Sequence, residues 1–195
     1  MYIYISPDNK YSIITAPRAG STTLENSHNL NRNSIIAKHI GYIPPDNGWD
    51  IDNDAVLNTE YSIAILRHPV SRLWSAWKMA HKQIIDKGFD DEHSFMEKHT
   101  KPWIYDFYMR CERVQKFPYI IPFSKMSDYF PKQYGVSTGS ECMEYDDQAL
   151  HLIRWYIPTG EKVFNREIEY YEKLQNRCEI LPLELFHQLR ETSYE

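Results

Sequence analysis

Several features are scarce or missing in this chain of 195 residues, and each absence excludes a class of protein. The three cysteines, Cys111, Cys142 and Cys178, form no CxxC pair, which argues against a zinc site and a disulfide framework. No apolar run is long enough to cross a membrane, and the first residues lack the basic segment and apolar core of a signal peptide. These absences predict a cytoplasmic protein without a membrane span.

The chain also has fewer positive than negative residues, because its 22 Lys and Arg and 27 Asp and Glu give a formal net charge of −5. Such a chain has no global positive field to hold a nucleic-acid backbone, so no nucleic-acid partner is expected. No His, Cys and carboxylate cluster has the spacing of metal ligands, and no metal is predicted. Any binding of an anion must therefore depend on a local group of basic residues.

What the chain does have is an ordinary globular composition, with 42% hydrophobic and 25% charged residues. Short β-branched and aromatic runs predict strands at 1–5, 11–15, 34–38, 61–66 and 119–123. The turn residues SPDNK join the first two strands as a hairpin, and the proline in YIIPF suits an edge or terminal position. Helical patterns predict helices at about 70–85, within 95–115, and at 146–156 and 165–175.

The order of these elements predicts the class of the fold. Strand 11–15, a loop, a short helix and strand 34–38 follow one another with the βαβ rhythm of a parallel sheet. Residues 41–60 are predicted to form a long loop of the kind that often serves function. We therefore expect a single α/β domain over residues 1–195, with a central parallel sheet flanked by helices.

The segment APRAGSTT at 16–23 stands between a predicted strand and a predicted helix. Arg18 supplies a permanent positive charge, and Gly20 lets the backbone approach a ligand closely. Further hydrogen-bond donors are the hydroxyls of Ser21, Thr22 and Thr23. Because a helix start has unpaired N–H groups, this segment is suited to hold a phosphate. It is not a Walker A loop, since GxxxxGK[ST] is absent, and a simple helix-capping turn stays open as the alternative.

The segment RHPVSRLWSAW at 67–77 also follows directly on a predicted strand. Arg67 stands at the end of the strand, and Ser75 lies eight residues on, one to two turns into the helix. The two side chains can converge on one anionic group, the guanidinium as a fork and the hydroxyl as a further donor. Arg72 is expected to face solvent or to pair with a carboxylate.

In this order, each after a predicted strand, the two segments resemble the sulfotransferase family that uses 3′-phosphoadenosine 5′-phosphosulfate (PAPS). PRAGSTT is similar to the family's 5′-phosphosulfate-binding loop, and RHPVSRLWSAW to its 3′-phosphate-binding segment. The resemblance covers about residues 11–80 and implies the P-loop-kinase-like architecture of sulfotransferases. It assigns the 3′-phosphate to Arg67 with Ser75, and the 5′-phosphosulfate to Arg18, Ala19, Gly20, Ser21, Thr22 and Thr23.

The resemblance also implies a reaction, in which the sulfuryl group passes in line from PAPS to an acceptor hydroxyl and leaves adenosine 3′,5′-bisphosphate. The acceptor is a carbohydrate, a tyrosine or a small molecule. Many family members have Lys where this chain has Arg18; Arg cannot lose its proton, so it would stabilise the leaving phosphate electrostatically. The general base would be His39, just after strand 34–38, with Glu60, Asp46 and Asp50 in reserve.

Two other functions stay open at this point. A nucleotide-binding protein with a sulfotransferase-like fold and no catalytic activity would carry the same two phosphate segments, because they bind and do not react. A nucleoside kinase is disfavoured by the missing Walker lysine.

Overall fold

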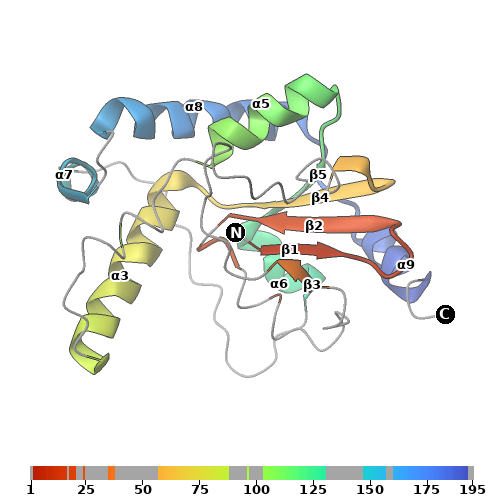
Figure 1. Ribbon diagram of the computed structural model, residues 1–195, viewed down its shortest axis with the longest axis horizontal. Coiled ribbons are helices and arrows are strands. Elements are labelled where there is room, and N and C mark those ends of the chain that lie inside the picture. Colours follow the sequence, from red (N-terminus) through yellow and green to blue (C-terminus); the bar gives the residue numbers. More distant parts are fainter. Residues whose placement is uncertain are drawn as a thin grey trace.

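The structure is a computed structural model, which describes residues 2–16, 18–20, 24, 35–37, 57–87, 96, 103–130, 147–156 and 160–192. These residues form an α/β fold, in which helices cover both faces of a five-stranded sheet (Figure 1). The α/β class predicted from the sequence is therefore confirmed, while a single domain over the whole chain stays a prediction.

The strands of the sheet lie in the order β3-β1-β2-β4-β5. They are β1 (Tyr2–Ile5), β2 (Tyr11–Thr15), β3 (Ile35–Ala37), β4 (Tyr61–Leu66) and β5 (Tyr119–Pro122). Each strand falls where the sequence predicts one, and the hairpin of β1 and β2 is confirmed by their antiparallel pairing. β5 is the last of these strands in the sheet, in agreement with the proline that it contains.

The sequence predicts a central parallel sheet, but the sheet is mixed, and only part of it is parallel. β1 pairs antiparallel with both β2 and β3, whereas β2 with β4 and β4 with β5 pair in parallel. Four strands thus run in one direction and β1 runs against them. β3 runs parallel to β2, but the two strands do not pair, because β1 lies between them. The tight hairpin places β1 on that edge of β2.

The described helices are α3 (Pro69–Lys87), α5 (Ile104–Val114), η3 (Phe123–Lys125), α6 (Met126–Tyr129), α7 (Asp147–Tyr156), α8 (Gly160–Arg177) and α9 (Leu183–Thr192). They include the four that the sequence predicts at 70–85, within 95–115, at 146–156 and at 165–175, and η3, α6 and α9 are additions. α8 begins earlier than expected, at Gly160, and α9 was not predicted. The signal for α9 was present in Pro182 before its first residue and in the spacing of Phe186 and Leu189, both of which are buried.

The two faces of the sheet carry different apolar clusters, because successive side chains of a strand point to opposite faces. On one face, Ala64 and Leu66 of β4 pack in the cluster that includes residues of α5 and α8. On the other face, Ile63 and Ile65 pack in the cluster that includes residues of α6 and α9. Figure 1 shows α5 and α8 side by side on one side of the strands, with α6 and α9 on the other.

The order of the strands creates a topological switch point between β2 and β4. The next described strand after β2 is β3, at one end of the sheet, whereas the next after β4 is β5, at the other end. In open α/β sheets, ligands bind outside the carboxyl ends of the strands at such a point, because the connections leave it in opposite directions. The two segments singled out in the sequence follow these two strands.

Among the described residues, no helix is both long enough and apolar enough to cross a membrane. A cytoplasmic location stays a prediction.

Candidate functional site

The candidate site lies at the carboxyl ends of β2 and β4, which are neighbours in the sheet. Thr15 near the end of β2 is paired with Ile65 of β4, so the turn that follows β2 lies beside Arg67, the residue directly after β4. α3 begins two residues later, at Pro69, and has no acidic residue in its first turn. The positive end of its dipole is therefore not offset by a carboxylate of its own first turn.

The turn after β2 has a backbone conformation that few side chains adopt. The Ala19 N–H donates to the Ala16 carbonyl at 3.1 Å, and between them Arg18 has a φ of 63°, in the left-handed region. A non-glycine residue in that region is uncommon, and such residues concentrate at functional sites. The surrounding structure must therefore hold Arg18 in place.

Gly20 completes the turn at a position where a side chain does not fit. Its φ is 98°, and a Cβ atom there would overlap the Met126 sulfur and come within 2.8 Å of the Met126 Cε. The Gly20 carbonyl accepts a hydrogen bond from the Leu24 N–H at 3.1 Å, which has the i to i+4 spacing of a helical turn. The strand and tight turn expected of a phosphate loop are thus present as far as Gly20.

Arg18 reaches across the switch point to the second segment. Its Nε and Nη2 donate to the Ser75 hydroxyl at 3.3 and 3.1 Å. The guanidinium is half-buried, and burial lowers the pKa of Arg18 from its ordinary value without removing its charge. Among the described residues, no carboxylate pairs with this guanidinium. A partly desolvated cation without a neutralising partner attracts an anion.

Arg67 contacts the turn after β2, the start of α3 and the residue after β5. Its Nη1 donates to the Arg18 carbonyl at 2.9 Å, and its Nε donates to the Ser71 hydroxyl at 2.8 Å. Its guanidinium also lies 4.1 Å above the centre of the Phe123 ring, just after β5. Of the two side chains expected to share one anion, Ser75 contacts Arg18, and Arg67 contacts the backbone of Arg18.

His68, between Arg67 and α3, caps the helix. Its Nδ1 accepts a hydrogen bond from the Val70 N–H at 3.3 Å, and its ring packs edge-on against Tyr171 at 5.1 Å. Burial lowers the pKa of His68, against a smaller opposing effect of Glu172, so the imidazole is held neutral with Nδ1 as an acceptor. His68 thus stabilises the start of α3.

Arg72 confirms the expectation that it pairs with a carboxylate. Its Nη1 lies 3.6 Å from Oε2 of Glu167, and both side chains are buried. Glu167 also accepts hydrogen bonds from three successive backbone N–H groups at the start of α5, those of Trp103, Ile104 and Tyr105. One carboxylate therefore ties α8 to both α3 and α5. No local pattern in the sequence indicates these contacts, because the groups lie more than 60 positions apart.

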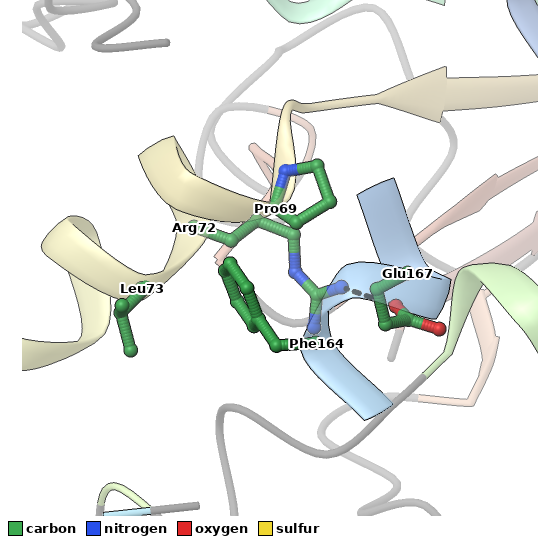
Figure 2. A pocket seen from close by; sticks show the side chains of 5 residues that line it. All are labelled: Pro69, Arg72, Leu73, Phe164 and Glu167. Atoms are coloured by element: carbon green, nitrogen blue, oxygen red, sulfur yellow. Dashed lines mark ion pairs between the residues drawn. The ribbon is translucent and has the colours of Figure 1, made fainter. Parts of the chain in front are cut away.

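A small pocket opens beside this ion pair (Figure 2). It is lined by Pro69, Arg72, Leu73, Phe164 and Glu167, and its volume is about 10 Å³, room for one water molecule. Figure 2 shows the Arg72 side chain reaching from α3 toward Glu167 on α8, with the Phe164 ring beside it. The pocket is too small for a nucleotide and belongs to the structural ion pair.

Several predicted site residues lie outside the described ranges. These are Ser21, Thr22 and Thr23 of the loop, the expected base His39, and the reserve residues Asp46 and Asp50. The third reserve, Glu60, is described and directly precedes β4. Because β4 runs parallel to β2, Glu60 lies at the amino ends of these strands and Arg18 at their carboxyl ends. Glu60 is therefore not a candidate base for this site.

The structure adds Ser71 and Phe123 to the residues that the sequence predicted. Ser71 stands inside the second segment, four residues after Arg67, so helical spacing alone can indicate this partner. Phe123 directly follows β5 and becomes a candidate only when the strand order is known. In the ranges that the structure describes, no group of three or more His, Cys, Asp or Glu side chains could hold a metal ion.

Comparisons with known proteins leave the site to be interpreted from its own geometry. No protein-family model matches the chain, and neither a curated protein nor a solved structure matches it.

Proposed function

We propose that this protein is a PAPS-dependent sulfotransferase that transfers a sulfuryl group to an acceptor hydroxyl. One observation carries the proposal: Arg18 from the first segment and Ser75 from the second meet at the switch point between two parallel strands, where no described carboxylate neutralises the guanidinium. The proposal includes the P-loop-kinase-like architecture of sulfotransferases, in which the phosphate loop follows a strand of a central sheet.

The residues present fit an anionic nucleotide. Gly20 allows the positive φ of the turn, Arg18 gives a half-buried positive charge, and α3 places the positive end of its dipole at the same edge. Ala19 and the hydroxyls of Ser21, Thr22 and Thr23 would join Arg18 around the 5′-phosphosulfate. Ser75 would donate a hydrogen bond from its hydroxyl to the 3′-phosphate side of the nucleotide.

The chemistry divides between the cofactor and the chain. PAPS, when bound, supplies the sulfuryl group and a phosphate as leaving group. Arg18 keeps its proton at any working pH, so its part is to stabilise the negative charge that develops on the leaving phosphate. His39 would take the proton of the acceptor hydroxyl, which belongs to a carbohydrate, a tyrosine or a small molecule.

A turnover assay tests this function. Release of adenosine 3′,5′-bisphosphate from PAPS is measured with a panel of sugars, phenols and tyrosine peptides as acceptors. At least one acceptor should stimulate release, and His39→Ala should lower that turnover by about 10²- to 10⁴-fold without changing nucleotide affinity. His187→Ala, at an exposed position of α9, is the control and should turn over at the parent rate. Nucleotide binding with no turnover on any acceptor would favour a non-catalytic nucleotide-binding protein.

A further inference from the structure

We infer that Arg67 is a positioning residue, which holds the strained turn at Arg18 in its binding conformation and does not itself bind the 3′-phosphate. The inference deepens the proposed function and rests on it for the identity of the ligand. Its structural part, the support of the turn by Arg67, can be measured without any ligand.

Arg67 joins three segments that meet at the carboxyl edge of the sheet. Nη1 donates to the Arg18 carbonyl in the turn after β2, and Nε donates to Ser71 in the first turn of α3. The face of the guanidinium rests on Phe123, directly after β5. Ser71 and Phe123 are themselves buried, so both are fixed points for the Arg67 side chain.

These contacts act on Arg18, a non-glycine residue of the turn whose backbone is left-handed. A left-handed residue with a side chain is disfavoured relative to the right-handed conformation. The hydrogen bond from Arg67 is charge-assisted and therefore stronger than a neutral one, which offsets that cost. Phe123 also supports the other side of the turn, because a Cβ at Gly20 would lie 3.5 Å from its ring.

The direction of the Arg18 side chain follows from this support. The Arg67 bond fixes the peptide that follows Arg18, and from that position the Arg18 guanidinium reaches the Ser75 hydroxyl. At least two of the five N–H donors of Arg67 and one face of its guanidinium are engaged within the protein. We therefore assign the ligand to Arg18 and the support of the turn to Arg67.

The inference is tested on two variants, Arg67→Ala and Ser71→Ala, with Arg154→Ala, at an exposed position of α7, as the matched control. The first measurement is hydrogen exchange of the Ala19 amide, which is bonded to Ala16 across the turn. Exchange should be about tenfold faster in both variants and unchanged in the control, with the unfolding temperature of Ser71→Ala close to that of the parent. Unchanged exchange in Ser71→Ala would overturn the inference even if Arg67→Ala failed to fold.

The second measurement is calorimetric affinity for adenosine 3′,5′-bisphosphate and for adenosine 5′-monophosphate, which lacks the 3′-phosphate. Arg67→Ala should weaken both ligands by the same factor, about tenfold, and Arg67→Lys should not restore affinity because an ammonium cannot make both directed bonds. Loss confined to the bisphosphate, with recovery in Arg67→Lys, would instead make Arg67 a phosphate ligand. If the parent protein binds neither nucleotide, the proposed function fails, and the exchange of the Ala19 amide still decides the role of Arg67.

Discussion

The Arg18 guanidinium donates from Nε and Nη2 to the hydroxyl of Ser75, at 3.3 and 3.1 Å and across 57 positions of sequence. A hydroxyl that accepts these bonds keeps its own proton to donate, and none of the described residues accepts it in a contact that the structure shows. The pair therefore places a cation for the 5′-phosphosulfate next to a hydroxyl donor for the 3′-phosphate side of the proposed nucleotide.

This pairing predicts that the effects of the two side chains on binding are not additive. Arg18→Ala should weaken adenosine 3′,5′-bisphosphate by about 10- to 150-fold, because a charge-assisted contact is lost. Ser75→Ala should cost less, about 2- to 10-fold, and the double variant should lose less than the product of the two factors. Calorimetry on the parent, the two single variants and the double variant completes this double-mutant cycle. Strictly multiplicative losses would mean that the two side chains act on the ligand independently.

The carboxylate of Glu167 is expected to stabilise the fold more than any exposed ion pair of α8. Glu167→Ala removes the partner of three backbone N–H groups and the carboxylate that faces buried Arg72, and it should lower the free energy of unfolding by about 3–5 kcal/mol. Glu169 on the same helix pairs with Lys173 at the surface, and Glu169→Ala should change that free energy by less than about 1 kcal/mol. Urea denaturation measures the free energy of unfolding of both variants. Equal losses in Glu167→Ala and Glu169→Ala would contradict the stabilising role of the buried contacts of Glu167.

The cap at His68 predicts a pH dependence of stability. Burial lowers the pKa of His68 in the folded protein below its ordinary value of 6.5, so the unfolded chain binds this proton more readily. The contribution of neutral His68 to the free energy of unfolding is fully present above about pH 6.5. It is lost as the pH falls through the lowered pKa of His68 in the folded protein. The free energy of unfolding should therefore fall more steeply from pH 7.5 to 5.5 in the parent than in His68→Asn, whose side chain still caps the helix. His187→Asn should follow the parent, and equal slopes in parent and His68→Asn would contradict the cap.

The elements with strong local patterns could be predicted from the sequence, and the contacts between distant elements could not. The run YSIAIL predicts β4, and Pro69 marks the start of α3, because both signals lie within a few residues. The place of β3 beyond β1 depends on which edge of β2 the hairpin occupies, which no local pattern shows.

The same division holds for the candidate site. The loop at Arg18 and the segment from Arg67 to Ser75 were predicted, since each follows a recognisable strand. Which arginine meets Ser75 was not predicted, because that depends on the left-handed backbone of Arg18 and on Phe123, which directly follows a third strand. The role of Glu167 was missed for the same reason: its partners lie on two other helices.

We propose a nucleotide site with separate groups for a 5′- and a 3′-phosphate. Calorimetric measurement of nucleotide affinity is the most direct test of this site. Adenosine 3′,5′-bisphosphate and ADP carry phosphates at different positions, and each is titrated into the protein with magnesium and with a chelator. The account predicts that the bisphosphate binds at least about tenfold more tightly than ADP, and that removing magnesium changes its affinity little, because the ligand meets fixed donors of the protein. Equal affinities for the two nucleotides, or binding that requires magnesium, would contradict it.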